Sequence, residues 1–127
     1  MADITKFLSK RAEGVTVTKE DGAAAFTIDY DGRSDENTVV LIENTDSSNA
    51  CRVKFSAGTG MSAGLGDLDV DIATSGLAVV GVLPSARFQN DDGKVDVAVT
   101  DQDDTEFTGS EADVKFIVIE LPKALTD

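Results

Sequence analysis

Short apolar runs rich in valine, isoleucine, phenylalanine and threonine recur along the chain, separated by clusters of glycine, aspartate, asparagine and serine. Within most runs apolar and polar residues alternate, and this period of two is typical of β-strands with one buried face. The pattern predicts eight strands, at 15–18, 24–29, 38–44, 50–56, 67–72, 76–83, 94–100 and 113–121. No helix longer than two turns is predicted.

Turn-forming residues connect several of these strands. Residues 19–22 and 45–49 predict two β-hairpins, one between the first and second strands and one between the third and fourth. The strand spacing is typical of sandwiches and jelly rolls. We therefore predict an all-β fold, a single-domain antiparallel β-sandwich or jelly roll of about eight strands over residues 15–127, preceded by a short N-terminal arm, residues 1–14.

Three predicted strands are apolar on both faces, namely those containing residues 39–42, 77–83 and 114–121. In the last of these, Val114, Phe116 and Val118 point one way, whereas Ile117, Ile119 and Leu121 point the other. A two-layer sandwich buries only one face of each sheet, so the second apolar face requires a cover. A loop, the N-terminal arm or another subunit would provide it, because contiguous exposed apolar patches usually mark interfaces.

The N-terminal arm differs in charge from the rest of the chain. Its residues 1–11 carry Lys6, Lys10 and Arg11 against a single acid, Asp3, whereas the whole chain has a net charge of −13. Its apolar residues Ile4, Phe7 and Leu8 have helix-like spacing. The arm is therefore either a frayed terminus or helical turn on its own domain, or a segment that docks on a neighbouring subunit.

Composition restricts the possible functions. The chain has no histidine and one cysteine, Cys51, so the common catalytic and metal-binding constellations are missing, and we predict no enzyme activity and no cofactor. Alternation places Cys51 on one strand face with Val53 and Phe55, as a small buried hydrophobe. The excess of 24 acidic over 11 basic residues disfavours binding to nucleic acid or to anionic membranes. We also find no membrane-spanning stretch and no secretion signal.

Three segments have features of ligand sites. Residues 58–66 hold four glycines but precede a strand rather than a helix, which argues against phosphate binding and favours a long flexible connection or a tip that orders only on contact with a partner. Asp67, Asp69 and Asp71 begin like a calcium loop but lack its later glycine and glutamate. These residues, and the acidic residues Asp101, Asp103, Asp104 and Glu106, are read as solvated acidic surface, with a cation site of another type as the alternative.

Several segments resemble small all-β proteins of tailed-bacteriophage virions, of the head-decoration or capsid-cementing kind. The resemblance is carried by residues 39–45, 53–60, 66–68, 84–88 and 116–122, and it covers about residues 38–122. It implies a β-sandwich that coats a capsid in many copies and reinforces contacts between its subunits. It further implies the major capsid protein as partner, a homo-oligomer such as a trimer, synthesis in the host cytoplasm and a final location on the capsid surface.

Combining both lines of argument, we expect the partner-binding residues in two places. They are Ile4, Lys6, Phe7, Leu8, Lys10 and Arg11 of the arm, and Ile117, Ile119 and Leu121 of the last strand. The alternatives are a neck-, tail- or fibre-associated virion module, or a β-sandwich that binds calcium or a glycan through its aspartate-rich loops.

Overall fold

A computed structural model of the protein describes residues 3–5, 7–8, 17–29, 38–61, 63–81, 85–90 and 93–120. The strands are β1 (Asp3–Thr5), β2 (Phe7–Leu8), β3 (Glu20–Asp21), β4 (Ala25–Asp29), β5 (Thr38–Asn44), β6 (Cys51–Phe55), β7 (Leu68–Ile72), β8 (Leu77–Val80), β9 (Lys94–Thr100) and β10 (Val114–Glu120). Single helical turns lie between them, at η1 (Ala63–Leu65), α1 (Ser85–Phe88) and η2 (Glu111–Asp113). The fold is all-β, as the sequence predicts.

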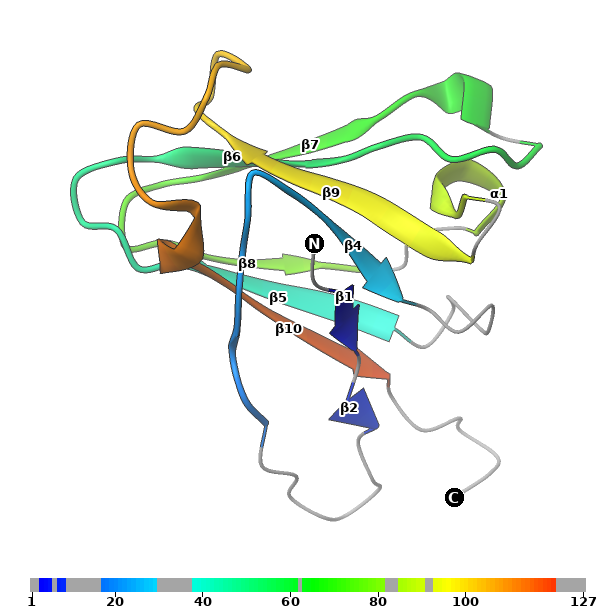
Figure 1. Ribbon diagram of the computed structural model, residues 1–127, viewed down its shortest axis with the longest axis horizontal. Coiled ribbons are helices and arrows are strands. Elements are labelled where there is room, and N and C mark those ends of the chain that lie inside the picture. Colours follow the sequence, from blue (N-terminus) through cyan, green and yellow to red (C-terminus); the bar gives the residue numbers. More distant parts are fainter. Residues whose placement is uncertain are drawn as a thin grey trace.

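The strands form two sheets that face each other (Figure 1). Sheet A has the order β1-β4-β9-β6-β7, and sheet B has the order β2-β10-β5-β8, with β3 also paired to β10. All pairs among β3 to β10 are antiparallel. In Figure 1, β6, β7 and β9 form the upper layer, and β5, β8 and β10 form the lower layer. The predicted sandwich architecture is confirmed.

Seven of the predicted strands match observed ones within a few residues at each end. The exception is the strand expected at 15–18. Residues 17–19 are not in a strand, and the short strand β3 begins only at Glu20. Alternation over the longer runs therefore predicted the strand positions well, whereas the four-residue run at 15–18 was too short to predict one.

Both predicted hairpins are wrong. β3 and β5 lie in sheet B, whereas β4 and β6, which follow them, lie in sheet A, so each turn carries the chain across the sandwich. At the first crossing, Gly22 N–H donates to the carbonyl oxygen of Val114 at 2.8 Å, and a Cβ at Gly22 would lie 2.8 Å from the Phe116 ring. A polar link between two sheets has the same local composition as a hairpin turn, so the sequence does not distinguish them.

The N-terminal arm is extended rather than helical. β1 pairs in parallel with β4, and β2 pairs in parallel with β10. One residue separates β1 from β2, so the arm joins both sheets on the same side of the sandwich. β7 and β8 form the opposite side. These two parallel pairs make the sheets mixed rather than purely antiparallel.

Alternate residues from both sheets fill the core, as the period of two requires. β5 and β10 bury every second side chain, and Phe26 of sheet A meets Phe116 of sheet B edge to face with ring centres 4.9 Å apart. Cys51, Val53 and Phe55 are fully buried together on β6, so the prediction for Cys51 is confirmed. Burial of these apolar side chains is the main stabilising contribution to the fold.

Candidate protein-binding face

The outward surface of sheet B is apolar. Strand register sets Ile117 of β10 opposite Leu41 of β5, and Leu41 opposite Val79 of β8. Ile119 lies opposite Val39 in the next row. The outer face of sheet B is defined by these side chains and Leu77, that is, by Val39, Leu41, Leu77, Val79, Ile117 and Ile119. The sequence-based conclusion that these three strands are apolar on both faces is confirmed, because their inward partners form the core.

Exposure increases across this face toward β8. Ile117 and Ile119 are half-buried, whereas Leu77 is 70% exposed and Val79 is 65% exposed. Large apolar side chains at this exposure cluster on few surfaces of soluble proteins and typically mark binding sites. Two of the four exposed large apolar side chains of the described residues therefore lie at the β8 side of sheet B, and the other two, Met61 and Leu65, lie on the glycine-rich loop.

A groove of about 260 Å³ crosses this face. Its apolar lining comes from Leu41, Leu77 and Ile117, and its polar rim comes from Lys19, Glu43 and Lys115. The rim charges are paired. Lys19 Nζ lies 2.6 Å from Glu43 Oε1, and Lys115 pairs with Asp21 of β3. The groove is therefore apolar at its centre and electrically balanced at its edge.

The expected binding residues divide into three groups. Ile117 and Ile119 lie on the outer face of sheet B, whereas Ile4, Phe7 and Leu8 belong to the N-terminal strands β1 and β2. Lys6, Lys10, Arg11 and Leu121 lie outside the described residues. Partner binding by all of these residues stays a prediction.

Sequence reasoning did not select the remaining residues of the face. Leu41, Leu77 and Val79 belong to runs that were recognised as apolar on both sides. In a run without polar residues, alternation does not reveal which set of side chains points inward. The register with β10 was needed to unite these residues with Ile117 in one surface.

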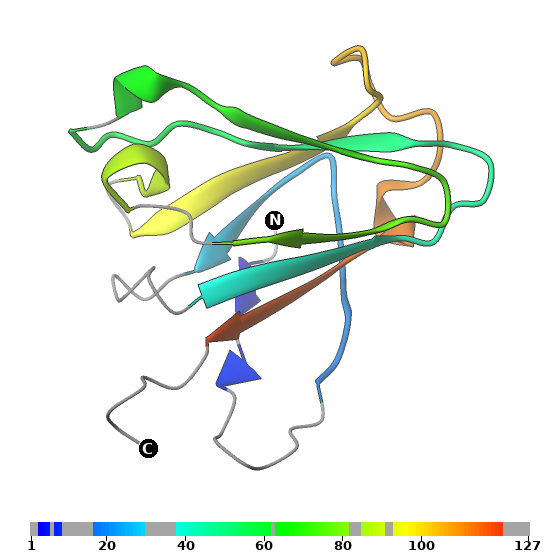
Figure 2. The ribbon, with the colours of Figure 1, turned by 180° about the vertical axis from the view of Figure 1, so that it is seen from behind.

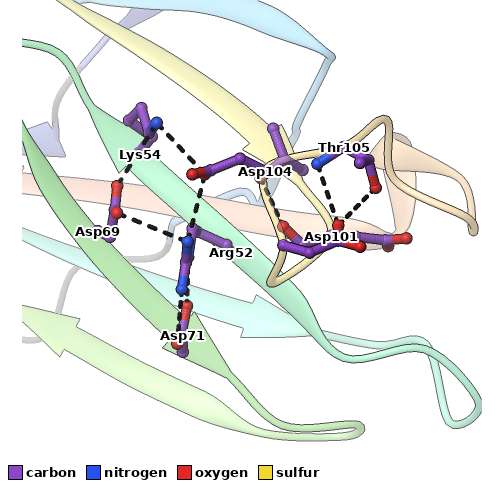
Figure 3. Close-up of polar contacts among 9 residues, drawn as sticks. Arg52, Lys54, Asp69, Asp71, Asp101, Asp104 and Thr105 are labelled. Carbon is purple, nitrogen blue, oxygen red and sulfur yellow. Dashed lines mark hydrogen bonds and ion pairs between the residues drawn. The ribbon is translucent and has the colours of Figure 1, made fainter.

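The outward surface of sheet A is charged instead. Arg52 of β6 lies opposite Asp71 of β7, with Nε 2.8 Å from Oδ1, and also lies 3.7 Å from Asp69. Asp104, from the loop after β9, lies 3.3 Å from both Arg52 and Lys54. Figure 3 shows the two basic side chains between the carboxylates of β7 on one side and Asp104 on the other.

Local geometry and charge explain the acidity of these carboxyls. The hydrogen bond and positive charge of Arg52 lower the pKa of Asp71 below its usual 3.8. Lys54, followed by Arg52, lowers the pKa of Asp104 in the same way. Asp104 has a left-handed backbone with φ of 67°, a conformation that aspartate tolerates, and its N–H donates to the Asp101 carbonyl at 3.0 Å. The turn thereby holds the Asp104 carboxylate over β6.

The other aspartates of these loops accept hydrogen bonds from the loop backbone. Asp67 Oδ1 accepts from Ala57 N–H at 2.7 Å, and Asp101 accepts from both the backbone and the hydroxyl of Thr108. The Thr105 hydroxyl and N–H donate to Asp103 and lower its pKa. Among the residues placed by the structure, no group of three or more acidic, cysteine or histidine side chains is arranged to hold a metal ion. Nothing in this arrangement favours the alternative of a cation site.

The glycine-rich loop is held against α1. Gly58 N–H donates to the Arg87 carbonyl at 2.8 Å, and the Arg87 guanidinium donates to the carbonyls of Gly66 and Asp67. A Cβ at Gly58 would lie 2.1 Å from the carbonyl oxygen of Gln89, so glycine is required there. Leu65, at the far end of the loop, is 71% exposed. These contacts anchor the described part of the loop to its own fold, whereas the sequence predicted a flexible connection or a tip that orders only on contact with a partner.

No protein-family model matches this chain, and neither a curated protein nor a solved structure matches it significantly. No helix within the described part of the chain is long and apolar enough to cross a membrane.

Proposed function

We propose that this protein is a non-enzymatic structural component of a tailed-phage virion, which decorates the head by binding the lattice of the major capsid protein. The outer face of sheet B is the binding surface. The observation that carries this proposal is the continuous apolar row from Ile117 through Leu41 to Val79, which the described chain leaves partly open to solvent.

The chemical character of the outer face of sheet B is suited to binding another protein. Its centre is apolar and its rim charges are paired, which matches the apolar core and polar rim of protein interfaces. The net charge of −13 disfavours contact with the packaged genome. A protein shell therefore fits the surface better than nucleic acid does.

Topology adds support from architecture. Two facing sheets with the orders β3-β10-β5-β8 and β4-β9-β6-β7 support the jelly-roll form of the predicted fold, which recurs among viral capsid domains. The resemblance of residues 38–122 to head-decoration proteins points in the same direction. Fold alone does not determine function, so the test is made on the surface itself.

The first experiment counts the protein in particles. Quantitative mass spectrometry of purified virions of the encoding phage is expected to find a copy number comparable with that of the major capsid protein. A few copies per particle would assign the chain to the neck, tail or fibres. Absence from particles would overturn the virion proposal.

The second experiment tests the face. Purified capsids that lack the protein are mixed with the wild type, with Ile117→Lys and with Leu65→Lys, and bound protein is measured by cosedimentation. Ile117→Lys is expected to weaken binding at least about tenfold, or ~1.4 kcal/mol. Leu65→Lys changes a similarly apolar side chain on the glycine-rich loop and is expected to bind normally. Equal binding by all three proteins would exclude the outer face of sheet B.

The N-terminal arm needs a separate test, because deletion would remove the backbone pairs of β1 and β2 along with the basic side chains. Replacement of Lys6, Lys10 and Arg11 by serine removes only the charges. Reduced capsid binding by this variant would support the arm as a second contact, and unchanged binding would remove it from the proposal.

A further inference from the structure

We propose that two copies of this chain associate edge to edge through β8, with β8 of one copy pairing antiparallel with β8 of the other. This self-association goes beyond the proposed function and does not require a capsid. β8 is the terminal strand of sheet B, paired with β5 on its inner side. Figure 2, which views the molecule from behind, shows β8 above β5 in the lower layer.

Within the described residues β8 pairs with β5 alone, and alternate backbone groups of β8 point outward. Asn44 N–H donates to the Gly76 carbonyl at 2.9 Å, which makes this a hydrogen-bonded pair of the antiparallel ladder. Hydrogen-bonded pairs alternate along such a ladder, so Ala78 and Val80 also bond to β5. The N–H and C=O groups of Leu77 and Val79 therefore point away from β5, toward the free edge.

The neighbouring edge of sheet A is protected, and that of β8 is not. β7 ends sheet A on the same side of the sandwich and carries the charged residues Asp69 and Asp71. Charged side chains on an edge strand oppose strand addition. β8 has the sequence Leu-Ala-Val-Val, and its outward side chains, Leu77 and Val79, are exposed and apolar. A strand can therefore add to β8 without burying a charge.

Charge distribution selects a second copy as the occupant. Two chains of net charge −13 repel each other wherever their acidic surfaces meet. Residues 72–86 contain no charged residue and form the longest uncharged stretch in a chain with 28% charged residues. β8 lies within this stretch, so pairing of β8 with β8 brings no charged residue of that strand against its copy.

Two-fold symmetry makes the contact self-limiting. With Ala78 at the centre, Leu77 of one copy pairs with Val79 of the other, and their outward backbone groups bond to each other. Both free β8 edges are consumed, so the assembly closes as a dimer rather than growing into a fibre. If the proposed function also holds, the dimer doubles the capsid-binding face.

The test is the oligomeric state of the full chain in solution, without capsids. Light scattering after size exclusion is expected to give twice the 13.3 kDa chain mass. Leu77→Lys places a charge at the edge, and Val79→Pro removes an outward N–H without removing a bond to β5. Both variants are expected to melt cooperatively and to give the mass of a single chain.

Leu65→Lys is the matched control, because Leu65 is 71% exposed and Leu77 is 70% exposed. This control is expected to stay dimeric. Hydrogen exchange gives a second measurement: the amides of Leu77 and Val79 should be protected in the dimer and should lose protection on dilution. A monomeric wild type at high concentration, a trimer, or rapid exchange at both amides would overturn the β8 dimer and leave the capsid proposal to its own tests.

Discussion

Arg52 and Asp71 face each other across β6 and β7 in a two-pronged ion pair. Arg52 Nε donates to Asp71 Oδ1 at 2.8 Å, and Nη2 donates to Oδ2 at 3.3 Å. The planar guanidinium matches both carboxylate oxygens at once, which an ammonium group does not. Because Asp104 also reaches Arg52, one side chain connects two strands with the loop after β9.

This pairing predicts a pH dependence of stability. The folded pKa values of Asp71 and Asp104 lie below the usual 3.8, so the ionised carboxylates stabilise the fold above pH 3.8. That contribution is lost as the pH falls through the lower folded values. Arg52→Gln is therefore expected to melt at a lower temperature than wild type at neutral pH, with a difference that shrinks in acid.

Thermal melts of both proteins across this pH range give the measurement. Arg52→Lys serves as the control, since it keeps the charge without the paired geometry, and it is expected to melt between the other two. A difference between wild type and Arg52→Gln that stays constant into acid would show that the ion pairs are not its cause.

Calcium is expected to leave stability unchanged. Asp69, Asp71 and Asp104 form ion pairs with Arg52 and Lys54, and the carboxylates of Asp67, Asp101 and Asp103 accept hydrogen bonds from their own loops. A bound cation would have to displace these contacts. Melting in calcium and in EDTA should give the same midpoint, and a higher midpoint in calcium would restore the cation-site alternative.

Two glycines of one loop should respond differently to substitution. Gly58→Ala places a Cβ 2.1 Å from the Gln89 carbonyl oxygen, so the loop and α1 must separate, at a cost on the order of 2 kcal/mol. Gly64→Ala meets nothing within 4 Å and is expected to change stability little. Denaturant unfolding of both variants measures this, and equal stabilities would contradict the close packing of Gly58 on α1.

Asn44 is a fully buried polar residue whose side chain forms hydrogen bonds with two links between the sheets, the one from β5 to β6 and the one from β7 to β8. Its Nδ2 donates to the carbonyls of Asn49 and Ala73, and its Oδ1 accepts from Asp46 N–H. Asn44→Ala leaves these groups without partners and is expected to lower the unfolding free energy by about 2 kcal/mol. Thr45→Ala, which removes an exposed hydrogen bond to Asp113, should have a smaller effect in the same denaturant titration.

The Cys51 thiol is expected to be unreactive in the folded chain. Burial, together with the negative charges of Asp71 and Asp46, raises its pKa to about 11, so the reactive thiolate is scarce at neutral and mildly alkaline pH. A thiol-specific reagent should therefore modify the protein only after denaturation. Rapid modification of the native protein would show that β6 opens locally.

The sequence by itself located most of the strands and the faces they bury. Alternation placed Val114, Phe116 and Val118 on the face opposite Ile117, and it placed Cys51 among the buried hydrophobic residues. Runs that are apolar on both sides also predicted that a second apolar face would need a cover. These features are local, because a strand side chain points to the opposite face from its neighbours whatever sheet the strand joins.

Only the tertiary structure decided how the strands are distributed. The expected hairpins are links between the two sheets, and the N-terminal arm adds a strand to each sheet. The loop after β9 places Asp104 beside Arg52, which also pairs with the aspartates of β7. The tertiary structure also left the outer edge of β8 unpaired by any of the described strands, beside an apolar groove. Strand pairing depends on contacts between residues far apart in the chain, and the hydrophobic pattern records that a face is buried without recording which strand lies beside it.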